Sequence, residues 1–529
     1  MLFRSVALVL PDATVETAGA QITASNGYVT FAGLKYLKTP ATGFKLQFKL
    51  VGSNHTDATQ QSRAFEITAG AAASIRWAST SSANDGKPRA SVQNNTAIKT
   101  SAGGALAIEI IDAYGNLVTA DDATTVTASV KTAGGAVTSL TNKTATAVSG
   151  SVRFSSLTLR AKVANYVLQF TAANAGKAVN ATFVLSDLIE LTAGAADHIA
   201  ATTIAEGAKS GQKFTTQPVI KIFDIDGNVV DSTATITASV APVSPNTEIA
   251  TFTNGQSSMA AVAGVANFDS GLLNANRLGL SAKVGTYRVT YSVGAPLGAL
   301  GSIYQDIYVA PGAAAKIAIV QQMAANTAIV VGEQLSTMPH LEVRDASDNK
   351  VTDDNVSTAT VKLYKAGSVT SVATSSPVAA SNGVIRFTNL SYSELPAADY
   401  SLHFKLVGKT GTDTELDSNV FELTHGAADH LEFVTQPGSA QSGIDLAQQP
   451  VLRVVDRFGY PVYGSTATSV SVSLLNAAST DVLVATAKSV NSTTALVTFN
   501  DVNISAKKGT YKLRFTATNA TTGIAINNT

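Results

Sequence analysis

The chain contains no cysteine, and this absence excludes disulfides, thiolate chemistry and Cys-ligated zinc. Charge is also scarce: Asp, Glu, Lys and Arg make up 14% of the residues, against roughly 25% in typical soluble proteins. The 37 basic and 37 acidic residues cancel, so no long-range field draws nucleic acid or anionic lipid to the surface. Nucleic acid is not an expected partner.

Long apolar runs are absent too. No stretch reaches the roughly 18 consecutive apolar residues of a membrane span, so no span is expected in these residues. Residues 5–10 follow Arg4 and resemble a short signal peptide, but Pro11 and Asp12 end the run before the roughly 7–15 residues that a secretory core needs. A strand is expected there instead.

Motifs for catalysis are missing as well. The six histidines show no H-E-x-x-H spacing, and no nucleophile elbow, P-loop or dinucleotide glycine pattern occurs. We therefore expect no catalytic residue, no cofactor and no enzyme. His198 and His430 occupy the same linker-edge position in two repeats, where an inter-domain hydrogen bond or plain exposure is expected. Trp77, the only tryptophan, is expected to fill a core, because sugar-binding platforms usually need several aromatics.

What the sequence does contain is a repeat. An alternating aromatic-x-aliphatic-x-aromatic pattern occurs five times, at steps of about 110 to 120 residues, which is the length of a small sandwich domain. The copies begin at Phe44, Tyr166, Tyr287, Tyr400 and Tyr511. A tyrosine at this place is typical of the tyrosine corner of immunoglobulin-like sandwiches, where the hydroxyl holds a loop. The first copy has phenylalanine and cannot form that corner.

A second signature is an aspartate at the end of an apolar strand, found at Asp112, Asp224, Asp345 and Asp456. Apolar and charged residues alternate before each, as in Ile108-Glu109-Ile110, which is the period of a strand with one wet face. Residues that tolerate positive φ follow each aspartate, and a valine then restarts the apolar face. This predicts a short hairpin-like reversal in which the aspartate accepts turn amide hydrogens.

A third pattern, Val152-Arg153-Phe154 in one copy, predicts a further strand before each aromatic strand. Its other copies lie at 29–31, 265–268, 385–387 and 497–499. Linkers of about four residues, such as Ala193-Gly194-Ala195-Ala196, leave little slack between repeats. If each domain has strands of about ten residues that rise about 33 Å, five domains end to end approach about 200 Å.

Together these patterns predict an all-β chain, a tandem array of immunoglobulin-like β-sandwich domains. The expected domains are 1–68, 69–191, 192–310, 311–423 and 424–529. The first is expected to lack its early strands, and so to expose a sheet edge or an uncovered apolar face. The last is expected to be truncated at its C-terminal side.

One motif raises the question of a metal. Asp224-x-Asp226-Gly227-Asn228 places alternating oxygen ligands on a tight turn, as in part of a calcium loop. It lacks the distant bidentate glutamate of a full site, and the sister copies do not keep Asp226. The ligand count therefore favours a turn over calcium.

The run at 428–437, followed by 449–459, resembles bacterial immunoglobulin-like repeats, as does Thr216-Gln217-Pro218 with 224–230. The likeness extends over nearly the whole chain. One copy departs from it, with Asp348 in place of glycine and Met338-Pro339 in place of Gln-Pro. The resemblance implies the stalks of exported adhesins of invasin or intimin type, surface-layer proteins, or spacers of secreted enzymes. It therefore implies a location outside the cell or on its surface.

The first functional hypothesis is a non-catalytic stalk or spacer that extends an adhesive or lattice-forming region. Its expected partners are the neighbouring domains of the same chain, and a host or cell-envelope protein or glycan. The alternatives are an array of carbohydrate- or protein-binding modules, using loops such as 268–287 that differ between copies, and the accessory region of an extracellular hydrolase.

Overall fold

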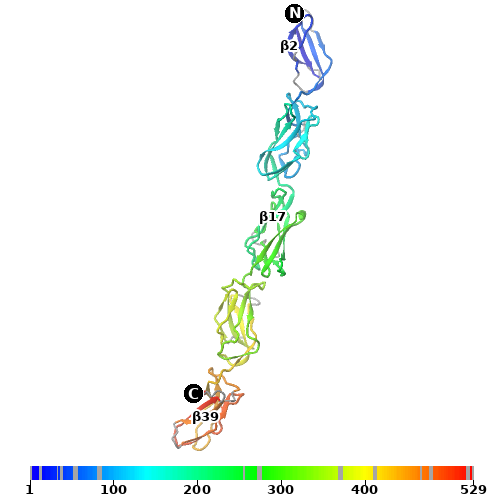
Figure 1. The fold of residues 1–529 in the computed structure, drawn as a ribbon. Helices are drawn as coiled ribbons and strands as arrows, with labels where there is room; N and C mark the ends of the chain where they lie inside the picture. Colours follow the sequence, from blue (N-terminus) through cyan, green and yellow to red (C-terminus); the bar gives the residue numbers. More distant parts are fainter. Residues whose placement is uncertain are drawn as a thin grey trace.

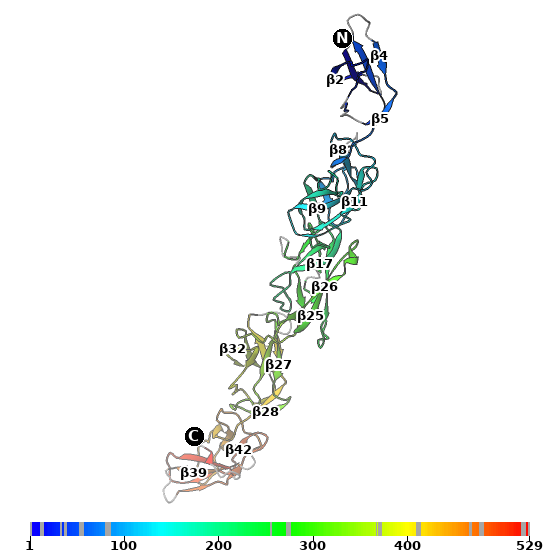
Figure 2. The ribbon, with the colours of Figure 1, turned by 45° about the horizontal axis from the view of Figure 1, so that its top comes forward.

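The computed structural model describes residues 3–10, 15–31, 34–35, 40–51, 58–79, 86–253, 257–270, 277–366, 368, 373–408, 414–464, 468–475, 481–519 and 525–526. Five β-domains follow one another along an extended array, with each domain in contact only with its neighbours in sequence (Figures 1 and 2). We call them the first to fifth domains and keep the boundaries given above as a proposal. The protein is an all-β tandem array of immunoglobulin-like β-sandwich domains.

Each of the second to fifth domains contains an equivalent set of three paired strands, and one of the three carries the aspartate signature. This strand lies between the first strand of the domain and the strand of the third sequence pattern. The three strands of these sheets are β6 (Ala72–Trp77), β8 (Leu106–Asp112) and β12 (Ser151–Phe154); β17 (Ala196–Thr203), β19 (Val219–Asp224) and β23 (Val265–Asn267); β27 (Lys316–Gln321), β29 (His340–Arg344) and β33 (Val384–Arg386); and β37 (His430–Thr435), β38 (Val451–Val455) and β42 (Leu496–Thr498).

The opposite sheet is built around the aromatic strand. It contains β9 (Thr125–Ala133), β14 (Ala164–Ala173) and β16 (Ile189–Thr192); β20 (Thr235–Pro242), β25 (Gly285–Val293) and β26 (Ser302–Val309); β30 (Thr358–Lys365), β34 (Ala397–Leu406) and β36 (Phe421–Thr424); and β39 (Thr468–Leu475), β44 (Lys512–Asn519) and β45 (Ala525–Ile526). In the fourth domain β32 (Val378–Ser381) joins both sheets into one.

Short strands complete the sandwiches. They are β7 (Ser91–Gln93), β10 (Val137–Thr141), β11 (Thr144–Thr146), β13 (Thr158–Ala161), β15 (Phe183–Leu185), β18 (Gln212–Lys213), β21 (Thr251–Phe252), β22 (Ser258–Ala260), β24 (Gly279–Ser281), β28 (Thr327–Val330), β31 (Ala373–Thr374), β35 (Glu415–Asp417), β40 (Val482–Val484), β41 (Lys488–Ser489) and β43 (Asn503–Ser505). The one helical element among the described residues is the 3-10 turn η1 (Gly298–Leu300).

Each of these four domains has its own apolar core between its two sheets. In the second domain Ile108 faces the core from one sheet and Leu168 from the other, and both are fully buried. Trp77 packs edge-on against Phe170, with ring centroids 5.0 Å apart, and its indole Nε1 donates to the carbonyl of Leu185 at 2.9 Å. Trp77 is partly buried and packs against the core of the second domain, so the prediction that it fills a core is confirmed in part.

The described part of the first domain is one sheet, of order β2-β1-β3-β4, with β5 also paired to β3. Its strands are β1 (Phe3–Val9), β2 (Val15–Thr23), β3 (Ala41–Val51), β4 (Ala58–Gln61) and β5 (Phe65–Ile67). Residues 5–9 of the run at 5–10 thus lie in a strand, as predicted. The expected strand at 29–31 is absent. In the other domains that strand pairs with the aspartate-bearing strand, and the sequence of residues 1–68 has no aspartate signature.

Among the described residues, none of the helical structure is long and apolar enough to cross a membrane.

Candidate functional site: the inter-domain junctions

Each of the second to fifth domains has a turn built around its signature aspartate. In the second domain, Asp112 Oδ1 accepts hydrogen bonds from the backbone of Tyr114 (2.9 Å) and Asn116 (2.8 Å). Its Oδ2 accepts from Gly70 in the linker (2.9 Å). The equivalent linker glycines Gly194, Gly312 and Gly426 donate to Asp224, Asp345 and Asp456 at 2.8, 2.7 and 2.7 Å. The predicted turn is confirmed, and the bond to the linker is a feature that the sequence analysis did not foresee.

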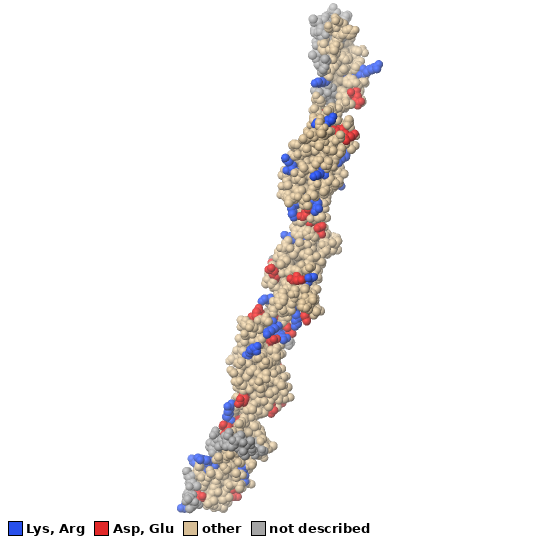
Figure 3. Space-filling model, viewed as in Figure 1, with Lys and Arg blue, Asp and Glu red and all other residues tan. Residues whose placement is uncertain are grey.

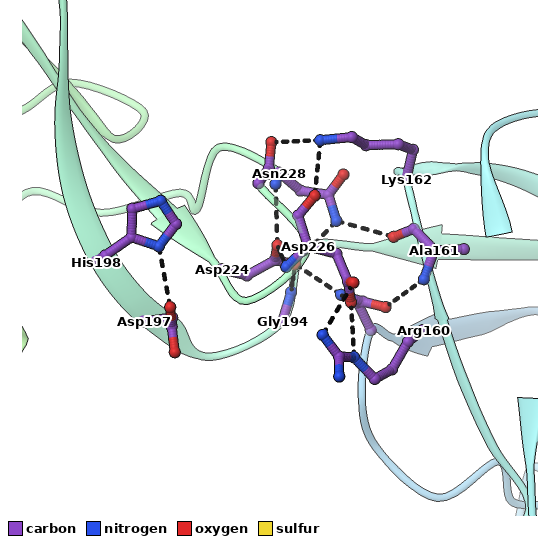
Figure 4. A network of polar contacts seen from close by, with 11 residues as sticks. Arg160, Ala161, Lys162, Gly194, Asp197, His198, Asp224, Asp226 and Asn228 are labelled. Carbon is purple, nitrogen blue, oxygen red and sulfur yellow. Dashed lines mark hydrogen bonds and ion pairs between the residues drawn. The ribbon is translucent and has the colours of Figure 1, made fainter. Parts of the chain in front are cut away.

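At the junction of the second and third domains, the turn also binds the preceding domain (Figure 4). Asn228 Nδ2 donates to Asp224 Oδ2 (2.9 Å) and to the carbonyl of Ala161 in the second domain (3.0 Å). Asn228 Oδ1 accepts from the backbone N–H of Val163 (2.8 Å). The side-chain amide thus donates to one backbone carbonyl and accepts from one backbone N–H of the loop that connects β13 to β14. The backbone of a neighbouring strand would make the same pair of hydrogen bonds.

Asn94 of the second domain completes this network. Its Oδ1 accepts from Ala161 N at 3.0 Å, while its Nδ2 donates to one carboxylate oxygen each of Asp224 and Asp226 at 2.9 Å. Asn94 is 1% exposed and Asp224 0%. Water would bind these groups if the domains separated, so each hydrogen bond to a charged group contributes a net of about 1.5–3 kcal/mol. The bonds from Asn94 to the two carboxylates therefore favour the docked arrangement.

Two basic side chains reach across the same junction. Arg160 Nε and a terminal guanidinium nitrogen donate to the two oxygens of Asp226 at 3.2 and 3.1 Å. Lys162 Nζ donates to the carbonyls of Asp226 (2.6 Å) and Gly227 (3.0 Å). Fork-like arginine–carboxylate pairs fix orientation as well as distance, so this contact resists twisting of one domain about the other.

The tyrosine corner shapes the loop that the turn binds. Tyr166 is fully buried, and its hydroxyl donates to the carbonyl of Lys162 at 2.6 Å. That bond fixes the backbone directly before Val163, whose N–H binds Asn228. The predicted corner therefore exists, and it also prepares the surface that receives the next domain.

Hydrogen bonding keeps the junction carboxylate ionised. Burial alone would raise the pKa of Asp224, but the hydrogen bonds from Asn228, Gly194 and Asn94 outweigh it and lower the pKa to about 2. For Asp226, burial likewise opposes the shift, and the bonds from Arg160 and Asn94 still lower its pKa. Both groups are negative at neutral pH.

The junction of the third and fourth domains repeats this arrangement with changed side chains. Asn349 Nδ2 donates to the carbonyl of Ala282 (2.9 Å), and its Oδ1 accepts from Val284 N (2.8 Å). Lys283 Nζ donates to the carbonyl of Asp348 at 3.1 Å, and the hydroxyl of Tyr287 donates to the carbonyl of Lys283 at 3.0 Å. The same loop and the same turn therefore meet twice in the chain.

Ser210 takes the place of Asn94 at this junction. Its Oγ accepts from Ala282 N at 3.2 Å and lies 2.8 Å from the hydroxyl of Ser347 in the next domain. Asp348, which departs from the repeat pattern, occupies the turn position with φ of 65° that glycine has in the sister copies. A hydrogen bond from Arg344 is the main cause that lowers the pKa of Asp348 to about 2.

The junction of the fourth and fifth domains uses a different pair. Tyr460 stands where the other turns have asparagine, and its hydroxyl donates to the carbonyl of Ser393 at 2.6 Å. The loop that it meets has Leu395-Pro396 in place of Ala-Lys. Phe458 packs over Gly332, where a Cβ would lie 2.3 Å from the ring. Loop and turn have changed together here.

The turn at the first junction bonds within its own domain. Asn116 Nδ2 donates to Asp112 Oδ2 at 3.0 Å, and among the described residues it makes no hydrogen bond to the first domain. The first domain has Thr39-Pro40-Ala41 in place of Ala-Lys-Val, and residues 36–39 lie outside the described part.

The residues of the calcium motif are therefore engaged with protein groups. Asp224, Asp226 and Asn228 bind backbone amides, two side-chain amides and a guanidinium, and no group of three or more His, Asp or Glu side chains suited to a metal occurs in the described part of the chain. The histidine expectation was wrong in part: His198 and His430 each contact the aspartate directly before them, at 2.9 and 3.0 Å, within their own domain.

Comparisons with known proteins give only distant similarities. No protein-family model and no curated protein sequence matches the chain. The solved structure of FdeC, an Escherichia coli adhesin, is 18% identical, with a TM-score of 0.28 over 68% of this chain and 100% of that one. Invasin, described as a bacterial integrin-binding protein, is 10% identical, with a TM-score of 0.26 over 82% of this chain and 77% of that one.

Extracellular domains 1–4 of protocadherin gamma B7 are 13% identical, with a TM-score of 0.29 over 76% of this chain and 90% of that one. At such scores, none of these similarities carries an inference about function.

Proposed function

We propose that this chain is a non-catalytic stalk or spacer of a surface or secreted protein, which holds an adhesive or lattice-forming region at a distance. The observation that carries the proposal is the pair of hydrogen bonds by which the Asn228 side-chain amide joins the third domain to the second. Asn349 makes the same pair of bonds between the fourth domain and the third. A chain of independent binding modules needs no such bonds, because flexible linkers would present each module equally well.

Two further features support a rigid spacer. The linkers are short and their glycines are bonded into the next domain at all four junctions. On the face shown in Figure 3, few charged side chains lie on the sides of the domains. Acidic and basic side chains lie close together near the junction of the third and fourth domains. The resemblance to exported bacterial repeats is the basis for proposing an extracellular or surface location.

Distance measurements across one junction test the proposal. Because the chain has no cysteine, spin labels can be placed uniquely at the exposed positions Lys131→Cys and Ser239→Cys, one on each side of the second junction. We predict a narrow distance distribution, and a distribution at least twofold wider in Asn228→Ala, because that change removes three hydrogen bonds, two of them between domains.

Asn116→Ala is the matched control, since its amide bonds within its own turn. It should leave the distribution between Lys131→Cys and Ser239→Cys unchanged. A broad distribution in the otherwise unchanged chain would contradict a rigid spacer.

A further inference from the structure

The fifth domain carries a loop like those that receive the next domain at the second and third junctions. Ala506-Lys507-Lys508 precedes Tyr511 at the same spacing as Ala161-Lys162-Val163 precedes Tyr166. The hydroxyl of Tyr511 donates to the carbonyl of Lys507 at 2.9 Å, at the spacing of the Tyr166 and Tyr287 corners. The loop therefore makes the corner hydrogen bond of the two internal loops that receive an asparagine, with Tyr511 half-buried rather than fully buried.

A second element of the receiving surface is present as well. The hydroxyl of Ser442 accepts from Ala506 N at 3.1 Å, just as Ser210 accepts from Ala282 N. In the internal junctions this side chain also contacts the turn of the following domain. In the fifth domain, Ser442 has the same internal bond and an exposed position.

Exposure distinguishes this loop from its internal equivalents. Ala161 and Ala282 are buried, as is Ser210, beneath the next domain. In the fifth domain Ala506 is half-buried and Ser442 is exposed. A crevice of about 550 Å³ lies there, lined by Ser442, Ala506 and Lys508 among others.

The loop sequence also indicates which turn fits. Both internal Ala-Lys-Val loops receive an asparagine, Asn228 or Asn349, whose amide bonds the alanine carbonyl and the N–H two residues later. The loop with Leu395-Pro396 receives Tyr460 instead. Ala506-Lys507-Lys508 offers the alanine carbonyl, the lysine and the following N–H of the first kind.

We propose that the 506–511 loop, with Ser442, is a docking site for one further domain of this repeat type whose turn carries asparagine four residues after the signature aspartate. The asparagine amide would bridge Ala506 O and Lys508 N. Lys507 would donate to carbonyls of that turn, as Lys162 does to Asp226. A turn with tyrosine at that position is rejected by this site.

The test appends a second copy of residues 186–310 after Thr529 of the full chain, so that the third domain arrives with its linker and with β16, the strand of the second domain that normally precedes that linker. Spin labels at Ser469→Cys in the fifth domain and at the copied Ser239→Cys report the new junction. We predict a distance distribution as narrow as that between Lys131→Cys and Ser239→Cys in the same fusion. Changing the copied Asn228 to Tyr, or Tyr511→Phe, should widen the new distribution at least twofold.

Two results would overturn the inference. One is a broad distribution at the new junction beside a narrow one at the second junction, which would leave the proposed spacer function standing. The other is an equally narrow distribution with the copied Asn228→Tyr, which would show that the loop does not select asparagine. A thermal unfolding transition for the appended domain, measured in each fusion, shows that a widened distribution is not caused by misfolding.

Discussion

At the scale of the residue, one buried carboxylate accepts hydrogen bonds from three parts of the chain. Asp224 accepts hydrogen bonds from its own turn, from the linker glycine Gly194 and from Asn94 of the preceding domain. A carboxylate with several donors stays ionised even when buried. Removing the negative charge therefore weakens the turn, the linker and the junction together.

The pH dependence follows from the direction of the shifts. The pKa values of Asp112, Asp224 and Asp348 are lowered to about 2 in the folded chain, below the value of about 3.9 in an unfolded chain. Groups with a depressed folded pKa contribute stability that is present above the unfolded pKa and is lost as pH falls through the folded one. We predict that thermal melting temperatures fall as pH drops from about 4 to about 2.

Calorimetry from pH 7 to pH 2 checks this prediction, with Asp224→Asn as the comparison. The variant should melt at a lower temperature at pH 7 and lose less on acidification, because one of the titrating groups is gone. Melting temperatures that stay constant down to pH 2 in the unchanged chain would show that these aspartates do not contribute as described.

At the scale of the element, the junction consists of a linker, a turn and a loop that approach one another very closely. Gly312 illustrates the approach: a Cβ there would lie 2.1 Å from the carbonyl oxygen of Ser210 in the preceding domain. The equivalent Gly426 has more room, with its closest neighbour, an atom of Asp456, at 3.4 Å. The same substitution therefore has different consequences at two equivalent positions.

We predict that Gly312→Ala forces the third and fourth domains apart, while Gly426→Ala leaves the fourth and fifth docked. Hydrogen exchange of the Val284 amide, which donates to Asn349, should speed up at least tenfold in Gly312→Ala. It should be unchanged in Gly426→Ala. Equal exchange rates in the two variants would contradict the close approach.

The elements also show what the sequence could and could not predict. The aspartate turns and the tyrosine corners follow from local patterns, because their hydrogen bonds join residues close in sequence. The bond from Val163 to Asn228 joins two domains, and its only sequence signal is the pairing of Ala-Lys loops with asparagine. The prediction of a strand at 29–31 was wrong, because a strand needs a pairing partner that its own sequence does not specify.

At the scale of the whole molecule, four core-containing sandwiches and the sheet of the first domain form one elongated array (Figure 1). Each of the four sandwiches is stabilised by its own apolar core. The second and third junctions add hydrogen bonds and ion pairs, while at the fourth junction Tyr460 and Phe458 also pack on the fourth domain. The length of the array therefore depends on the contacts at the junctions, while the fold of each sandwich does not.

Small-angle X-ray scattering on the full chain tests this account most directly. We predict a rod-like profile with a maximum dimension of about 200 Å, the sum of five domains whose strands of about ten residues each rise about 33 Å, together with the connections between them. The triple variant Asn228→Ala, Asn349→Ala, Tyr460→Phe should give a more compact and heterogeneous profile with unchanged β-structure. A compact profile in the unchanged chain would contradict the account, because it would mean that the domains fold back on one another and that the junctions do not hold them in line.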